Sequence, residues 1–333
     1  MMTTKFSRRR ILHLAAGATA LPVLSHVARA QSYPSRPITI VVGAAAGGPT
    51  DTITRTISER MRVQLGQTII IENNGAAAGS IAHGRVARAV PDGYTLSLGH
   101  WGTHVVNGAV YTLSYDVLKD FEPVALISVS PYFIVGKRDL PPKDLKELVA
   151  WLKAGGDKVT QGTSGAGSPG HIGGVFLQSI LGSRWVFVPY RGANPVMQAL
   201  LGGEFDFTFS TPDQASPQIA AGRIKPYAVT AKDRMAIAPN VPTTDEAGLP
   251  GFYLSYWHAL WAPRGTPKDI VERLNAAVVA ALADQPVRAR LADLGQEIFP
   301  REQQRPEALG ALHKAEVEKW WPIIKEAGIK PEA

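Results

Sequence analysis

The sequence predicts an α/β fold with mixed, largely parallel sheets that helices flank. Short apolar runs rich in β-branched residues alternate with segments of helical period, a pattern typical of parallel sheets covered by helices. The length of 333 residues suits two domains that each bury a core, and the alternating pattern occurs in two successive sets. With 45% hydrophobic and 19% charged residues, the composition excludes intrinsic disorder.

The first α/β set starts with a strand over residues 38–42, which is β-branched and bounded by Pro37 and Gly43. A helix with one apolar face follows and stops at Gly66. The further strands predicted in this set are 68–72 and 94–98.

The second set follows two strand-like runs within residues 124–136, which Ser130-Pro131 separates. The chain then returns through a strand over 254–262 to a helix that Thr266-Pro267-Lys268-Asp269 is expected to open as a capping box. A last helix carries Leu309, Leu312 and Trp320 at compatible spacing. The strands predicted between these points are 159–161, 185–188, 205–209 and 224–230, with helices near 145–152 and opening at Pro169, Pro195 and Pro217.

Residues 1–30 predict a cleavable export signal. They hold five of the 35 basic residues and no acidic one, so the remaining chain has 30 basic and 28 acidic residues and loses most of the +7 charge. The segment has a basic start and an apolar stretch over 11–27 that is too short and broken to span a bilayer. Ala28-Arg29-Ala30 follows and places cleavage near Gln31. Ser7-Arg8-Arg9-Arg10-Ile11-Leu12 resembles a twin-arginine signal, with a general secretory signal as the alternative. The charge therefore indicates export and not a nucleic-acid partner.

A glycine-rich turn between the first strand and the first helix is a candidate anion site. Gly47 and Gly48 precede Pro49 there, at the carboxyl end of a strand and the amino end of a helix. Main-chain N–H groups at such a point lack partners within the helix, and the helix dipole favours an anion. Thr50 can add a hydroxyl donor, whereas Asp51 is expected to cap the helix.

The second set repeats this arrangement over residues 162–171. Ser168 is a natural N-cap ahead of Pro169, and Thr163 and Ser164 supply hydroxyl donors. In open α/β sheets, ligands lie beyond the carboxyl ends of the strands. We therefore expect the two turns to face one cleft.

Two enzyme motifs overlap the second turn. Gly165-x-Gly167-x-x-Gly170 matches the dinucleotide fingerprint, but the acidic residue expected about 20 positions later is missing. Gly162-Thr163-Ser164-Gly165-Ala166 approaches the nucleophile elbow of hydrolases, so a periplasmic serine hydrolase that uses Ser164 is the alternative function.

Metal chemistry has little support in the sequence. His100 and His104 have the i, i+4 spacing of a metal site, but no Glu lies between them and the chain has no Cys. The sequence therefore predicts no metal and no cofactor.

Four further residues lie close to the expected ligand side. Trp101, Arg191 and Asp213 each follow the end of a predicted strand. Trp101 either lines the pocket or belongs to the core. His171, one turn into its helix, either faces the ligand or satisfies the main chain of the turn.

An ordered set of short motifs runs along the mature chain from about Tyr33 to the last helix. It includes Tyr33-Pro34-Ser35-Arg36-Pro37-Ile38, Ala46-Gly47-Gly48-Pro49-Thr50-Asp51, Val90-Pro91-Asp92-Gly93-Tyr94-Thr95-Leu96, Val188-Pro189-Tyr190-Arg191-Gly192 and Ala262-Pro263-Arg264-Gly265-Thr266-Pro267. Taken together, the set resembles the substrate-binding receptors of tripartite tricarboxylate transporters, the Bug-type periplasmic receptors.

This resemblance implies a two-domain fold of the periplasmic-binding-protein type (type II), with the chain crossing twice between the domains. Domain 1 is then expected to comprise residues 31–129 and 231–333, and domain 2 residues 130–230. It also implies a monomeric, non-catalytic receptor in the periplasm that delivers a small carboxylate to transmembrane permease subunits. A ligand sensor that hands its state to a signalling partner is the further alternative.

The resemblance further implies that main-chain amides of residues 44–51 and 163–171 hold the carboxylate. The ligand-binding residues predicted from the turns, the strand ends and the resemblance are Ala44, Ala45, Gly47, Gly48, Thr50, Asp51, Trp101, Thr163, Ser164, Gly165, Gly167, Ser168, His171, Arg191 and Asp213.

Two departures from the family pattern bear on the ligand. Gly43-Ala44 stands where the family commonly has Pro-Phe, and residues 74–79 replace a turn that usually carries a basic residue and a proline. Loss of an aromatic wall should widen the pocket. This leads to the hypothesis of a bulkier ligand, an aromatic carboxylate instead of a short dicarboxylate or tricarboxylate.

Overall fold

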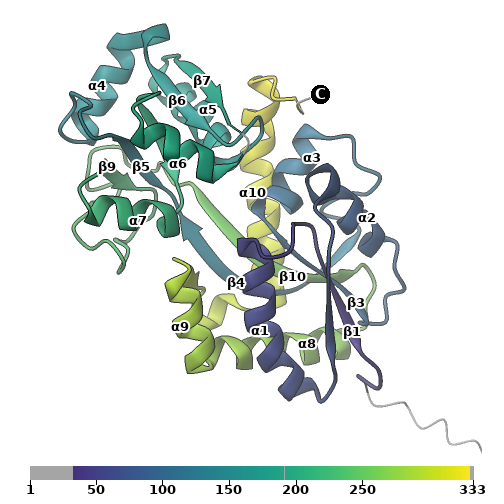
Figure 1. Ribbon diagram of the computed structural model, residues 1–333. Helices are drawn as coiled ribbons and strands as arrows, with labels where there is room; N and C mark the ends of the chain where they lie inside the picture. The colour runs from purple at the N-terminus through teal and green to yellow at the C-terminus, as the bar shows by residue number, and fades with distance from the viewer. Residues whose placement is uncertain (1–32, 191, 331–333) are drawn as a thin grey trace, which may run out of the picture. The chain divides into compact units, whose positions relative to one another are not determined.

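Two mixed β-sheets form the framework of the protein, which the computed structural model describes over residues 33–190 and 192–330. The predicted export signal and cleavage site lie outside these residues. In sheet A, β1 pairs in parallel with β2 and β3, and β10 runs antiparallel to both β3 and β4 (Figure 1). The strands of sheet A are, in spatial order, β11 (Glu297–Ile298), β4 (Phe121–Pro131), β10 (Ser255–Pro263), β3 (Thr95–His100), β1 (Ile38–Val42) and β2 (Ile69–Asn73).

Sheet B repeats the central strand order of sheet A. Its strand β6 pairs in parallel with β7 and β8, and β5 runs antiparallel to β8 and β9. β6 therefore occupies in sheet B the place that β1 occupies in sheet A. The arrangement confirms the predicted α/β class with mixed sheets. The strands of sheet B are, in spatial order, β7 (Val186–Pro189), β6 (Thr160–Thr163), β8 (Phe207–Ser210), β5 (Phe133–Lys137) and β9 (Ile224–Val229).

Helices connect the parallel strands. In α1, Ile53, Ile57 and Met61 are fully buried, and the helix ends at Gly66 in the left-handed conformation with φ 68°, as the sequence predicted. The helices are α1 (Pro49–Leu65), α2 (Ser80–Ala87), α3 (Asn107–Val110), α4 (Leu145–Gly155), α5 (Pro169–Leu181), α6 (Ala193–Leu201), α7 (Pro212–Ala220), α8 (Lys268–Ala283), α9 (Gln285–Asp293) and α10 (Pro306–Glu326), with the short helices η1 (Ala76–Gly79), η2 (Gly102–Val106), η3 (Gly156–Lys158) and η4 (Arg301–Gln303).

Two predicted helix starts were wrong because other residues already provide the cap. β8 ends at Ser210 and Thr211 has the extended geometry of an N-cap, so α7 begins at Pro212 and Pro217 lies inside the helix. Likewise α6 begins at Ala193 directly after Gly192, and Pro195 is not its first residue.

One further local prediction differs from the structure. Thr266 donates its hydroxyl to the carbonyl of Pro263 (2.7 Å), so it does not cap α8, whose N-cap is Pro267.

After β3 the chain continues as the short helix η2, in which the Thr103 hydroxyl donates to the carbonyl of His100 (3.0 Å).

Two crossings join the sheets, and one buried side chain ties them together. β4 leads through Tyr132 into β5, and Leu254 leads back into β10. The Thr230 hydroxyl, next to the end of β9, donates to Leu254 O (2.6 Å) and accepts the N–H of Tyr132 (2.9 Å). The main chain of Thr230 also donates to Tyr132 O (2.8 Å) and accepts from Leu254 N (3.3 Å). The predicted domain boundaries close to these crossings stay a prediction.

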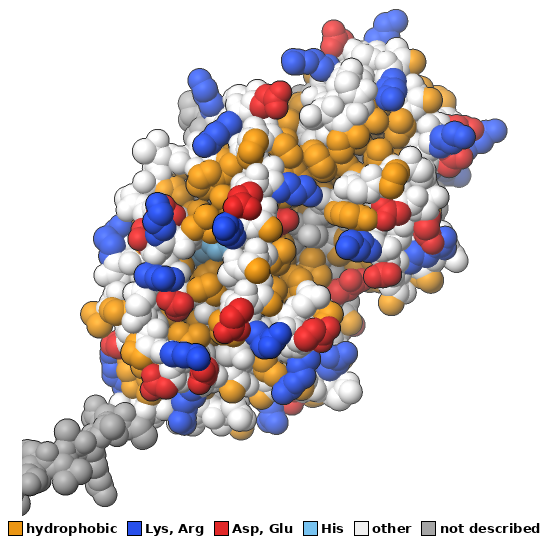
Figure 2. Space-filling view, turned by 180° about the vertical axis from the view of Figure 1, so that it is seen from behind, with side chains coloured by type: hydrophobic (Ala, Val, Ile, Leu, Met, Phe, Trp, Pro, Cys, Tyr) orange, Lys and Arg blue, Asp and Glu red, His pale blue; other side chains and the backbone are white. Residues whose placement is uncertain are grey.

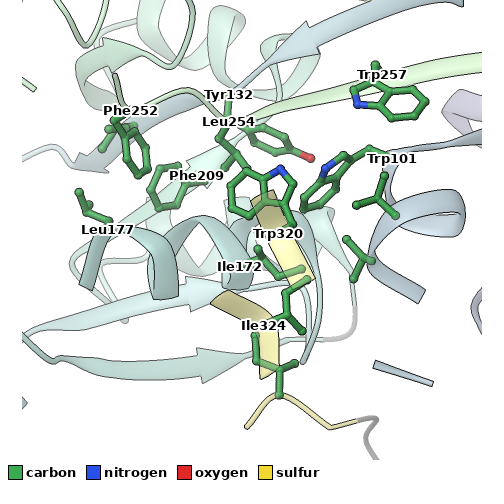
Figure 3. Close-up of a cluster of buried hydrophobic side chains, with 14 of the residues drawn as sticks. Trp101, Tyr132, Ile172, Leu177, Phe209, Phe252, Leu254, Trp257, Trp320 and Ile324 are labelled. Atoms are coloured by element: carbon green, nitrogen blue, oxygen red, sulfur yellow. The ribbon is translucent and has the colours of Figure 1, made fainter. Parts of the chain in front are cut away.

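An aromatic cluster packs α10 against elements of both sheets (Figure 3). Trp101 follows β3 and meets Trp320 of α10 edge to face, with ring centroids 5.3 Å apart. Phe176 of α5 contacts the same Trp320 at 5.2 Å and stacks on Phe252 at 5.3 Å. Aromatic pairs of this kind contribute about 0.5–1.5 kcal/mol beyond their buried area. The long last helix is therefore part of the core of both halves.

We expect Thr230→Val to lower the free energy of unfolding by about 1–3 kcal/mol, because the Tyr132 N–H and Leu254 carbonyl lose a buried partner. Urea denaturation measures the change. Thr230→Ser keeps the hydroxyl and is the control, which should stay close to wild type. A Thr230→Val protein as stable as Thr230→Ser would contradict a tie through the hydroxyl.

Candidate functional site

A small cavity opens at the carboxyl ends of β6 and β8, with a volume of about 50 Å³. The chain leaves β6 towards β7 on one side and reaches β8 on the other side, so this is the switch point of the sheet, where α/β proteins bind ligands. The lining residues are Tyr132, Thr163, Ser164, Pro169, Gly170, Ala193, Val196, Met197, Thr208, Phe209, Ser210, Thr211 and Gln214. The volume suits one carboxylate group or one to two waters.

The first residues of three helices line this cavity. Pro169 and Gly170 open α5, Ala193 opens α6, and Thr211 is the N-cap of α7. Each helix N-terminus contributes roughly half a positive charge and unpaired N–H groups. The lining that the structure describes contains no charged side chain. The cavity is therefore suited to a carboxylate held by main-chain donors and hydroxyls.

The turn that carries Ser164, residues 163–168 (turn B), is held by its own helix. Gly167 has φ 72° and donates its N–H to Nδ1 of His171 (3.0 Å), four residues later. Ser168 is the N-cap of α5, and its hydroxyl accepts the N–H of His171 (3.4 Å). His171 thus satisfies the main chain of the turn, one of the two predicted roles. A ligand contact of His171 stays a prediction.

The corresponding turn after β1, residues 43–48 (turn A), has the same kind of hydrogen bond. Gly47 has φ 78° and donates its N–H to Oδ2 of Asp51 (2.8 Å). Burial opposes ionisation of Asp51, but the hydrogen bonds from Arg55 and Gly47 outweigh it and lower its pKa below the ordinary value. Gly48, not Asp51, has the N-cap position of α1. The N–H of Gly47 is therefore engaged within the turn, and exposed Ala45 is better placed than Gly47 to offer main-chain groups.

A strained loop lies against turn A. Ala77 and Ala78 have φ of 49° and 53°, a left-handed conformation that costs a non-glycine residue about 1–2 kcal/mol. Buried Asn107 holds this loop, since its side-chain amide donates to the carbonyl of Ala78 (2.8 Å). A Cβ on Gly79 would come within 2.5 Å of the Gly43 carbonyl, so only glycine allows the loop and turn A to pack this closely. Strain of this kind is characteristic of functional sites.

Two tyrosines connect Thr50 of α1 with the cavity. Tyr256 of β10 is half-buried. Desolvation raises its pKa well above the ordinary value, and neighbouring Tyr132 raises it further, while a hydrogen bond with Thr50 opposes the shift. Tyr132 itself lines the cavity, and burial raises its pKa, with the charge of Asp213 adding to the effect. The Thr50 hydroxyl also lies 3.3 Å from Nε2 of His258. These contacts bring the first turn of α1 near the cavity of sheet B.

Sequence reasoning missed Tyr132, Tyr256, Thr211 and the strained loop. Thr211-Pro212 repeats the pattern of Ser168-Pro169 and could have been found from it. Tyr132 lies between β4 and β5 and Tyr256 lies on β10, and the partners of both depend on the tertiary fold. Ala77 and Ala78 give no sequence signal, because alanine does not favour a left-handed conformation.

Two predicted site residues have other surroundings. Trp101 is fully buried in the aromatic cluster, which is the core role considered from the sequence and leaves no ring surface for a ligand. Asp213 lies exposed in the first turn of α7, outside the cavity lining. Arg191 lies outside the described residues.

The histidines that could complete a hydrolase triad with Ser164 have partners elsewhere. Nε2 of His258 lies beside the Thr50 hydroxyl, and Nε2 of His313 beside the carbonyl of His104 (2.6 Å). His104 stacks on Trp261 with ring centroids 3.8 Å apart. Among the described residues, no group of three or more His, Asp or Glu side chains is placed to hold a metal ion.

A buried histidine cluster lies in sheet A and its packing helices. The rings of His83 and His104 are 4.6 Å apart, and Ser97 bonds both: His83 Nδ1 is 2.7 Å from its hydroxyl, and His104 Nε2 is 3.4 Å away. Burial lowers the pKa of His83 and of His258 to about 3, and that of His313 to about 4. These imidazoles are therefore neutral when the protein is folded at neutral pH.

Comparison with solved structures defines the class of protein. BugD, described as a periplasmic binding protein, is 39% identical with a TM-score of 0.74, over 90% of this chain and 100% of BugD. MatC from Rhodopseudomonas palustris, solved with bound malate, is 41% identical with a TM-score of 0.74, over 88% of this chain and 100% of MatC. The protein has the fold of these binding proteins, as the sequence motifs predicted.

The family follows from two sequence matches. Residues 53–329 match the family described as Tripartite tricarboxylate transporter family receptor. The "UPF0065 protein in the TAR-I ttuE-ttuC' intergenic region" of Agrobacterium vitis is 44% identical over 307 residues, which is 92% of this chain and 89% of that protein. The chain belongs to the tripartite tricarboxylate transporter receptor family.

We expect the free energy of unfolding to fall as the pH drops from 6.5 towards 4. The buried histidines bind protons only after unfolding, because their folded pKa values lie near 3 to 4 and unfolded histidine titrates near 6.5. His83, His258 and His313 should each account for about 2 kcal/mol of the loss at pH 5 relative to pH 7.5. Urea denaturation across this pH range measures the slope, and His258→Gln should flatten it. A pH-independent wild type would contradict the neutral cluster.

Proposed function

We propose that the protein is an exported receptor that captures a small organic dicarboxylate and does not catalyse a reaction. The observation that carries this proposal is the cavity at the starts of three helices, whose described lining holds no charged side chain. Such a cavity binds an anionic group through fixed main-chain donors. Malate, which is bound in the related MatC structure, is a dicarboxylate.

One carboxylate of the ligand would occupy this cavity, and the other end would reach turn A. The cavity of about 50 Å³ admits a carboxylate but not a complete dicarboxylate. Turn A is exposed at Ala45 and Ala46 and lies beside the strained loop, so it offers main-chain groups without a cationic side chain. A ligand that satisfies donors of both halves only when they are close together favours the closed form.

Surface charge supports local recognition. Figure 2 shows Lys and Arg side chains interspersed with Asp and Glu on the face that it displays. Without residues 1–30, the chain has 30 basic and 28 acidic residues. Attraction of an anionic ligand then depends on the helix ends at the cavity more than on the field of the whole molecule.

The cellular setting follows from the family and the predicted signal. The described part of the chain includes no helix with the length and apolarity needed to cross a bilayer. This proposal includes export by the signal predicted in residues 1–30. It also includes action in the periplasm as a monomer and delivery of the ligand to permease subunits.

Ligand size depends on the residues beside turn A. A Cβ on Gly43 would come within 2.2 Å of Nε2 of His83, so the histidine fills the space beside this glycine. The space beside Gly43 is therefore already filled, and the expected widening rests on the small side chain of Ala44 alone. The bulkier aromatic ligand stays a hypothesis, and short dicarboxylates are the first ligands to test.

Thermal melting of the mature protein tests the proposal against malate, adipate, phthalate and an uncharged diamide. A dicarboxylate at 100 times its Kd should add about 2.7 kcal/mol and raise Tm by several degrees, and the diamide should have no effect. Ser164→Ala should weaken the best ligand because it removes a hydroxyl from the cavity lining. Ser179→Ala is the matched control, because Ser179 is exposed on α5, the helix that follows turn B.

The enzyme alternative gives the opposite result. Hydrolysis of p-nitrophenyl acetate that disappears in Ser164→Ala but persists in Ser179→Ala would overturn the binding function. Absence of a Tm shift with every carboxylate in a broad panel would also overturn it.

A further inference from the structure

Turn A and turn B contain the same sequence and hydrogen-bond pattern. Each has a glycine with positive φ, a proline two residues later and a side-chain acceptor four residues later. Gly47 donates to Oδ2 of Asp51 (2.8 Å), and Gly167 donates to Nδ1 of His171 (3.0 Å). Both acceptor atoms are bonded to Cγ of their side chains, so the two bonds close rings of the same size.

The two hydrogen bonds occupy equivalent places in the fold. Turn A follows β1 and turn B follows β6, and each of these strands lies between its two parallel neighbours. Asp51 and His171 are both in the first turn of the helix that follows. The same hydrogen bond occurs at the same point of two sheets and is made by different residue types. This indicates that the turn needs a side-chain acceptor for its glycine N–H.

We propose that Asp51 and His171 are positioning residues that lock the two ligand-facing turns by accepting the glycine N–H. This proposal rests on the proposed function, because the turns matter only if they hold a ligand. In turn B the locked ring contains Pro169 and Gly170, two residues of the cavity lining. In turn A it contains Thr50, whose hydroxyl lies beside His258.

The lock imposes a chemical condition on residue 171. Nδ1 of the imidazole must be unprotonated to accept the N–H of Gly167, so the ring carries its proton on Nε2. Asparagine can replace histidine as the acceptor, because its Oδ1 is bonded to Cγ at the equivalent place. Alanine has no acceptor and removes the hydrogen bond. The side chain of Asp51 performs the same function with a carboxylate, which Arg55 neutralises at 2.9 Å.

The experiment compares His171→Ala, His171→Asn and the control Ser179→Ala with wild type. Hydrogen exchange of the Gly167 amide, followed without ligand, should accelerate in His171→Ala and stay slow in His171→Asn and Ser179→Ala. Affinity for malate or adipate, whichever wild type binds better, should fall about tenfold in His171→Ala and recover to within about threefold in His171→Asn. Thermal melting of all variants confirms that they fold.

Each result decides a separate point. Equal exchange in His171→Ala and wild type would overturn the lock. An accelerated amide with unchanged affinity would overturn the positioning role. If His171→Asn lost affinity as His171→Ala does while its amide stayed slow, His171 would contact the ligand directly, and the positioning role would again be overturned. A wild type that binds no carboxylate would refute the proposed function, whereas the exchange comparison would still decide the lock.

Discussion

Main-chain N–H groups at the first turns of α1, α5, α6 and α7 are the constraint on which the site depends. These groups cannot be satisfied inside their helices, so the surrounding sequence must either provide acceptors or leave the donors to a ligand. Proline at positions 49, 169 and 212 removes one donor at each start, and Ser168 satisfies another. At the starts of α5, α6 and α7, the donors that remain lie at a cavity whose described lining has no charged side chain, where a carboxylate can accept their hydrogen bonds.

Buried polar groups of sheet A have hydrogen-bond partners within the core and do not depend on a ligand. His83, Ser97 and His104 share hydrogen bonds within the core, and burial keeps the imidazoles neutral. Neutral histidines supply donors and acceptors without the desolvation cost of a buried charge. They also fill space close to turn A, as His83 does beside Gly43. The histidine cluster close to turn A is thus polar but uncharged.

Much of the fold could be predicted because its signals are local. β-branched runs marked the strands around β1 and β6, and the Gly-Pro turns at residues 47–49 and 167–169 marked the starts of α1 and α5. The prediction failed where two local signals competed, as at Pro212 and Pro217. The sequence also left Trp101 open between pocket and core, because a residue after a strand end can point either to the cleft or to the core. The packing of Trp101 against Trp320 places it in the core.

The shared lock explains why two turns of different composition can do similar work. The position of the acceptor atom fixes the turn, so the residue type is free to vary with its surroundings. On turn A the acceptor is a carboxylate whose charge Arg55 offsets; on turn B a neutral imidazole provides the same geometry beside a cavity suited to an anion. A carboxylate at residue 171 would lock the turn equally well but repel an anionic ligand a few residues away. The choice of histidine there is consistent with a site that must attract carboxylates without any cationic side chain in its described lining.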